Sequence, residues 1–141
     1  MSLLGNIRAG VMSNLSTLSV NGDGYLLTPP EPPCFEVASP DDGYVYGPTF
    51  QRGTDSVTII VRGIIQLGES TESQKTLDDW MEPSGSTSVK TLLESDRTLG
   101  GAVDDLMVVS VIGPRRLATP EVPGAIYLCA EWLVRIIVSP Q

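Results

Sequence analysis

A strictly alternating segment near the C-terminus constrains the fold of this chain more than any other feature. In Ala125–Val138 every second residue from Ile126 onward is apolar, and the positions between them are mixed. Successive side chains of a strand point to opposite faces, so this pattern predicts a strand with one buried face. A slip of one residue would expose the whole apolar set, and the pairing register is therefore well determined. The apolar positions are Ile126, Leu128, Ala130, Trp132, Val134, Ile136 and Val138.

A second strand precedes this one and completes a hairpin. We expect Leu106–Ile112 as the first arm, Ala125–Val138 as the second, and the twelve residues of Gly113–Gly124 as the loop between them. A hairpin turn needs only about two to five residues, so a loop of this length indicates a role beyond chain reversal. Upstream, the β-branched run in Ser56–Leu67 predicts a central strand that is covered on both faces.

The first third of the chain predicts one helix followed by irregular structure. Residues 2–18 carry apolar residues at three- and four-residue steps, which indicates an amphipathic helix. Asn21–Pro33 is rich in glycine and proline and is expected as a loop, since proline forbids helix and favours an extended path. Short strands are expected at Cys34–Val37 and Tyr44–Tyr46.

Two short helices are expected in the middle of the chain. Thr71 and Gln74 fit a capping box that opens the first, and Pro83 ends it. Ser86 is expected to cap the second, which closes before Gly100. The inner faces of the pair carry Leu77, Trp80, Met81, Val89, Leu92 and Leu93.

These elements predict one α+β domain over residues 1–141. The expected architecture is a mostly antiparallel sheet with a long C-terminal hairpin, packed against an N-terminal helix and a pair of short central helices. Cys34 and Cys129 match no metal-ligand spacing and are expected as buried thiols, with one disulfide as the alternative. The N-terminus lacks the pattern of a signal peptide, and no apolar run approaches the ~18 residues of a membrane span.

Composition argues against several function classes. The net charge is −8 and the chain has no histidine. An acidic surface repels phosphate, which disfavours sequence-specific nucleic-acid binding. Without an imidazole the chain lacks the usual base of nucleophilic hydrolases and the commonest nitrogen ligand of zinc. We therefore expect no enzyme, no cofactor and no metal site, and only 6% aromatic residues disfavour a carbohydrate- or receptor-binding module.

The remaining polar motifs have simple structural interpretations. The pairs Asp41-Asp42, Asp78-Asp79 and Asp104-Asp105 are expected as solvated acids, because neighbouring side chains diverge. A weak divalent-cation site shared between subunits is the alternative. Gly100-Gly101 is expected to turn the chain from helix to strand.

One basic cluster is a candidate partner-binding site. Arg115 and Arg116 form the only adjacent basic pair, and Leu117 follows them. We expect these three residues at the tip of the Gly113–Gly124 loop, where the arginines pair with carboxylates of an adjacent subunit or another protein. A solvated turn is the alternative interpretation.

A spaced pattern between residues 50 and 138 resembles a known family. The segment joins a helix pair with a Ser-Val-Lys opening to an Asp-x-Thr-Leu-Gly-Gly turn before the hairpin. The chain resembles the small tail terminator proteins of long-tailed bacteriophages that infect actinobacteria. The motifs are Arg52-Gly53-Thr54-Asp55, Ser88-Val89-Lys90, Asp96-Arg97-Thr98-Leu99-Gly100-Gly101 and Gly124-Ala125-Ile126-Tyr127.

The resemblance implies a structural virion protein of the tail or neck, assembled in the host cytoplasm. It implies a homohexameric ring that terminates the tail tube and joins it to the head, with the major tail tube protein on one side and the head-completion protein on the other. DNA would pass through the ring without sequence-specific contacts. A neck (head-completion or stopper) protein or another minor tail protein is the alternative, and a small binding domain unrelated to phages is a more distant one.

Overall fold

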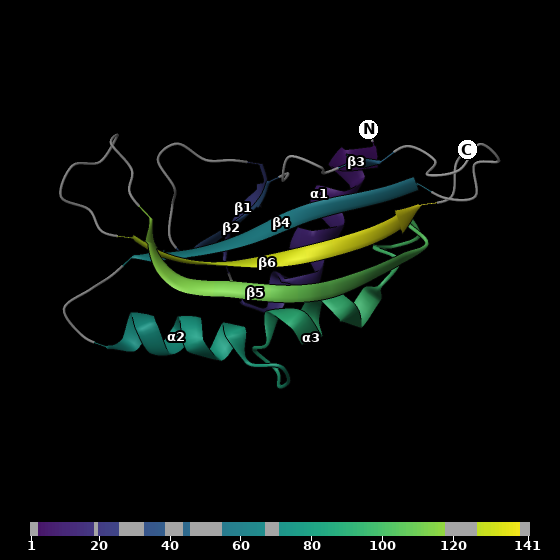
Figure 1. Cartoon of the computed structure of the whole chain (residues 1–141). Coiled ribbons are helices and arrows are strands. Elements are labelled where there is room, and N and C mark those ends of the chain that lie inside the picture. Colours follow the sequence, from purple (N-terminus) through teal and green to yellow (C-terminus); the bar gives the residue numbers. More distant parts are fainter. Residues whose placement is uncertain are drawn as a thin grey trace.

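The chain folds into two layers, a sheet and a set of helices packed on one of its faces (Figure 1). The computed structural model describes residues 3–18, 20–25, 33–38, 44–45, 55–66, 71–117 and 127–138. The expected α+β architecture is confirmed, with its N-terminal helix, central helix pair, mostly antiparallel sheet and C-terminal hairpin.

The sheet has six strands, and its centre is the pair β4 and β6. The strand order is β1-β2-β4-β6-β5, and β3 pairs with β4 off this path. β4 and β6 pair along their full length, so β2 and β3 share the other edge of β4. The strands are β1 (Asn21–Gly24), β2 (Cys34–Ala38), β3 (Tyr44–Val45), β4 (Asp55–Gln66), β5 (Asp105–Leu117) and β6 (Tyr127–Val138).

The C-terminal hairpin is longer than its sequence predicts. β5 continues through Gly113 and Pro114 to Leu117, which pairs with Tyr127, so the expected loop boundary at Gly113 is wrong. An irregularity between Ile112 and Arg115 accommodates the glycine and the proline. Proline is tolerated there because β5 lies at the edge of the sheet, where one side of the strand needs no ladder hydrogen bonds. The rest of the expected loop, residues 118–124, lies outside the described residues.

The loop expected at Asn21–Pro33 is wrong at its start, where the structure has the strand β1. Its sequence, Asn-Gly-Asp-Gly, has little strand propensity, yet it pairs in parallel with β2. Tertiary hydrogen bonds hold it there: the Asn21 N–H donates to the Pro33 carbonyl at 2.9 Å, and the Arg8 guanidinium donates to the Gly24 carbonyl at 2.6 Å.

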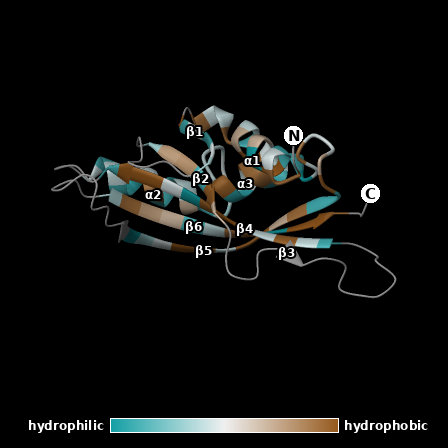
Figure 2. Cartoon of the chain, turned by 90° about the horizontal axis from the view of Figure 1, so that it is seen from above, coloured by the Kyte–Doolittle hydropathy of each residue, from teal (hydrophilic) through white to brown (hydrophobic). Residues whose placement is uncertain are grey.

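The N-terminal helix α1 (Leu3–Asn14) lies next to the helix α3 (Val89–Leu93), and hydrophobic residues occur on both (Figure 2). Its predicted stripe is confirmed at Ile7, Val11 and Leu15, which are fully buried, whereas Leu4 is 38% exposed. The helix ends at Asn14, short of the predicted residue 18, and a 3-10 turn η1 (Ser16–Leu18) follows. Packing explains why position 10 inside the helix is a glycine, because a Cβ there would lie 2.8 Å from the Leu99 Cβ.

The central helix pair is confirmed, and α2 begins after Thr71 as predicted, but the predicted capping hydrogen bond at Thr71 is absent and the predicted cap Ser86 is wrong. Thr71 precedes α2 (Glu72–Met81) in a helical backbone conformation, and its side chain makes no capping hydrogen bond. The cap of α3 is Ser88 rather than Ser86, because Ser88 has the extended backbone of an N-cap and its Oγ accepts the Thr91 N–H at 3.2 Å. A 3-10 turn, η2 (Glu94–Asp96), follows α3. No described helix is long and apolar enough to cross a membrane.

The main core lies between the helices and one face of the sheet. Trp80 and Trp132 are both buried there, as expected, and the Phe35 ring lies between them with centroid distances of 4.8 and 6.1 Å. Gly63 in β4 makes room for these rings, since a Cβ would lie 2.8 Å from the Phe35 Cε1. The alternating residues of β6 from Leu128 to Val138 all face this core.

The opposite face of the sheet carries no described helix. The expectation that β4 is covered on both faces is therefore wrong for the described residues, where Ile60 remains half-buried. A small second cluster of Cys34, Ile64, Tyr127 and Cys129 lies on this face. Both cysteines are free and buried, which confirms the expected thiols.

Candidate functional site

The edge strand β5 presents the largest set of exposed apolar side chains in the described part of the chain. Met107, Val109 and Ile112 are 51%, 44% and 59% exposed. β5 has one neighbour, β6, and its other side is an edge of the sheet. Single exposed apolar residues are ordinary, but several in a row along an edge strand are typical of a protein contact.

The backbone of this edge is partly closed by the chain itself. The Val108 N–H donates to the Glu94 carboxylate at 3.1 Å, and Arg97 pairs with Asp105 at 2.7 Å. Val109 is an extra residue that breaks the register with β6. Bulges and side-chain caps of this kind protect edges against uncontrolled strand pairing. The side chains of β5, more than its backbone, are therefore what the strand offers to a partner.

The contacts of Glu94 also shift its acidity. Burial favours the neutral carboxyl, but hydrogen bonds from Lys90 and from the Val108 N–H, with the charges of Lys90 and Arg97, hold the pKa of Glu94 below its ordinary value. Hydrogen bonding to Arg97 likewise lowers the pKa of Asp105. Both carboxylates stay charged and tie the helix pair to the start of β5.

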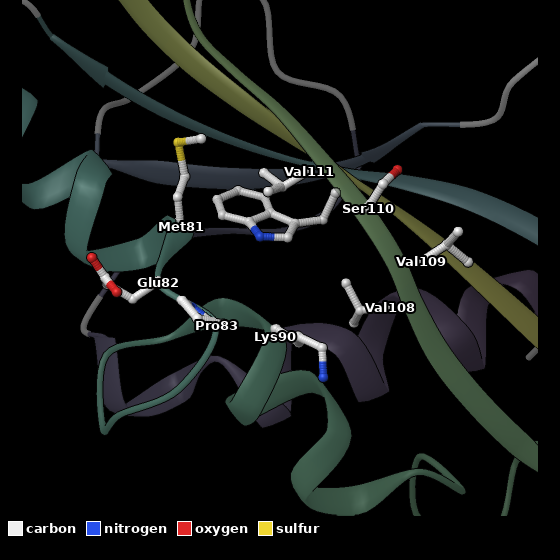
Figure 3. A pocket seen from close by; sticks show the side chains of 9 residues that line it. Met81, Glu82, Pro83, Lys90, Val108, Val109, Ser110 and Val111 are labelled. Carbon is white, nitrogen blue, oxygen red and sulfur yellow. The ribbon is translucent and has the colours of Figure 1, made fainter.

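A small cavity opens beside β5 and is lined mainly by apolar groups (Figure 3). Met81, Pro83 and Lys90 line one wall, and the segment 108–111 of β5 lines the other. Its volume is about 120 Å³. Pockets for metabolites or drug-sized ligands measure about 300–1,000 Å³, whereas a cavity of about 150 Å³ holds one benzene ring. The site therefore suits a single apolar side chain.

A ladder of alternating charges crosses the helix-free face. Arg62 of β4 contacts Glu36 of β2 at 2.5 Å and Glu131 of β6 at 2.9 Å, and Arg115 of β5 pairs with the other oxygen of Glu131. The two carboxylates are only 5% and 8% exposed. Two arginines balance two glutamates, so the buried charges are compensated. The ladder links four strands, β2, β4, β6 and β5, by side-chain ion pairs.

Sequence reasoning missed the ladder, although it left a signal. Arg62 and Glu131 each interrupt an otherwise apolar strand, and they are direct partners in the β4–β6 register. Opposite charges placed inside two apolar strands predict a cross-strand pair once the register is known.

The predicted partner-binding residues lie in β5 and not at a loop tip. Arg115 pairs with Cys129 in register and uses its guanidinium within the chain, on Glu131. Arg116 and Leu117 continue the strand opposite Leu128 and Tyr127, and their side chains lie outside what the structure describes. Arg115 is thus first a structural residue, although its side chain is still 57% exposed.

The polar motifs considered in the sequence do not converge on a reaction centre in the described residues. Asp78 and Asp79 are exposed on α2, Asp105 is paired with Arg97, and Asp41-Asp42 lies outside the described residues. Gly100 and Gly101 have positive φ angles of 72° and 93°, which confirms their role in the turn. No group of three or more potential ligands is placed to hold a metal ion in the described segments.

Comparisons with known proteins add no family to this description. A scan against protein-family models and a search of curated proteins each find no match for the chain.

Proposed function

We propose that this chain is a structural protein of a long-tailed bacteriophage, a tail terminator that forms a ring at the end of the tail tube and joins the tube to the head. The residue pattern between positions 50 and 138 motivates the proposal. The major tail tube protein and the head-completion protein are its proposed partners, besides further copies of the chain.

The observation that carries the proposal is the character of β5 and its cavity. Met107, Val109 and Ile112 are exposed along β5. Met107 and Ile112 lie on the helix-free face, in register with Arg135 and Glu131, and a cavity that fits one apolar side chain lies on the helix side of the same strand. Such a surface is suited to a protein partner and not to a small substrate. The lack of histidine in the chain agrees with a role in assembly rather than catalysis.

Imaging of the particle tests the proposal directly. A reconstruction of the neck region is expected to show the chain as a ring of six copies, with a mass six times the 15.1 kDa of one chain. A single copy, or a ring whose symmetry is not a multiple of three, contradicts it.

Deletion of the gene separates the terminator from its nearest alternative. Without a terminator, tails should grow to uncontrolled lengths while filled heads remain tailless. Tails of normal length that lack only a head attachment would instead identify a neck protein. The purified chain should also show no hydrolase or nuclease turnover, and a reproducible rate abolished by replacing one carboxylate would contradict the structural role.

A further inference from the structure

The helix-free face of the sheet carries an apolar patch around a single arginine. Arg135 of β6 lies between Thr58 of β4 and Met107 of β5 in the register. Leu133 and Ile137 flank it along β6, and Ile60 lies opposite Leu133. We call these residues the free-face patch: Thr58, Ile60, Met107, Leu133, Arg135 and Ile137.

The patch has the composition of a surface that a partner covers. Strands with apolar residues on both faces are typical of sheets covered on both sides, yet every described helix packs on the other face. Met107 is 51% exposed, and Ile60, Leu133 and Ile137 are half-buried. Arg135 is exposed, and its guanidinium makes no ion pair or hydrogen bond with any described residue. A partner that covers the patch must supply an acid, because an unpaired buried guanidinium is strongly unfavourable.

The outer surface of α2 offers such acids. Asp78 and Asp79 lie near the C-terminal end of the helix, and Glu82 follows it; all three are exposed. No described residue forms an ion pair with Asp78 or Asp79 or donates a side-chain hydrogen bond to either carboxylate. Carboxylates at a helix C-terminus are unfavourable because the helix dipole is negative there, and an arginine from outside would relieve this.

The two surfaces lie on opposite sides of the molecule. Leu77 and Trp80 turn the inner face of α2 toward the sheet, so Asp78 and Asp79 face outward from the helix layer. The free-face patch faces outward from the sheet layer. One copy can therefore present its patch to a second copy and its α2 to a third.

We propose that the free-face patch of one copy binds the acidic end of α2 in the next copy, with Arg135 pairing to Asp78 and Asp79. A symmetric contact of patch on patch would bring Arg135, at its centre, against Arg135 of the other copy. The contact is therefore head-to-tail, and head-to-tail contacts generate closed rings or open chains. This inference deepens the proposed function, since it assigns the surfaces that build the ring.

Two variants with one damaged surface each test the contact in purified protein. Arg135→Glu disables the patch, and Asp78→Lys with Asp79→Lys disables α2. In sedimentation velocity the wild-type chain is expected to form an oligomer and each variant to remain monomeric. An equimolar mixture should assemble again, because each patch then faces an α2 of opposite charge in the other variant. The control Ser16→Glu with Thr17→Glu adds the same negative charge as Arg135→Glu at exposed positions and should assemble like the wild type.

Several results would overturn this inference. They are a wild-type chain that stays monomeric at its highest soluble concentration, variants that assemble normally, and a mixture that stays monomeric. A ring that still forms with Arg135→Glu removes the proposed contact and leaves the terminator proposal intact. The particle reconstruction tests the terminator independently, whichever surfaces meet.

Discussion

The charge ladder allows a stability prediction that depends on burial. Arg62→Met removes the guanidinium that joins Glu36 and Glu131, whose side chains are only 7% and 9% exposed. Glu131 keeps Arg115 as a partner, so Glu36 is the carboxylate left without its ion pair. Breaking a buried pair by removing one partner costs about 3–5 kcal/mol, because a charge is left desolvated and uncompensated.

The expected loss lies near the lower end of that range. The Arg62 side chain is 23% exposed, so water reaches part of the pair and screens it. About 3 kcal/mol is a large share of the roughly 5–15 kcal/mol that stabilises a domain. For a chain of this size it should lower the thermal midpoint by roughly 10–15 °C.

Denaturant and thermal unfolding of matched variants measure this difference. Arg97→Met is the control, because it also removes an arginine from an ion pair, but Arg97 and Asp105 are 47% and 49% exposed. Water screens an exposed pair, so its loss should change the free energy of unfolding far less than the loss of Arg62. Adding Glu36→Gln to Arg62→Met should recover part of the loss. If Arg62→Met lowers the free energy of unfolding by no more than Arg97→Met does, the ladder does not stabilise the fold as a buried charge network and the prediction is refuted.

Three further predictions follow from the packing and the charges. Gly63→Ala places a Cβ 2.8 Å from the Phe35 Cε1 and should cost about 1–3 kcal/mol in denaturant unfolding, and unchanged stability would refute the tight approach. Glu94 has a lowered pKa in the folded state, so its contribution is present above the ordinary value of 4.5 and is lost as pH falls through the folded pKa. Glu94→Gln should therefore flatten the acid limb of a stability–pH curve, and an unchanged limb would contradict this. Arg116→Glu should keep the thermal midpoint within a few degrees but block the joining of the protein to tails. Arg115→Glu should in addition destabilise the fold, because it places a second carboxylate next to Glu131. Wild-type yields of infectious particles with Arg116→Glu would show that this end of the hairpin is only solvated.

Local periodicity determined most of the secondary structure. The alternation of β6 placed Leu128, Trp132 and Ile136 on the core face without any knowledge of their partners, because the period of a strand is set by its backbone. The stripe of α1 likewise identified Ile7 and Val11 as buried residues. Sequence alone also argued against histidine-based chemistry, since the chain contains no histidine.

Features that depend on a partner distant in sequence were decided by the tertiary structure. The residues of β1 have little strand propensity, and β1 exists because β2 and Arg8 satisfy its backbone. The extension of β5 past Gly113 depends on β6 continuing to Tyr127 beside it. For the same reason Arg115 became a partner of Glu131 and not a residue at a loop tip.

The candidate assembly surfaces show the same division. The sequence placed apolar residues on both faces of β4 and β6, which predicts cover on both sides. Only the fold shows that the described helices all pack on one face and that Arg135 lies at the centre of the other. Periodicity assigns a residue to a face of its own strand, but the layer that covers this face is set by packing between elements far apart in the chain.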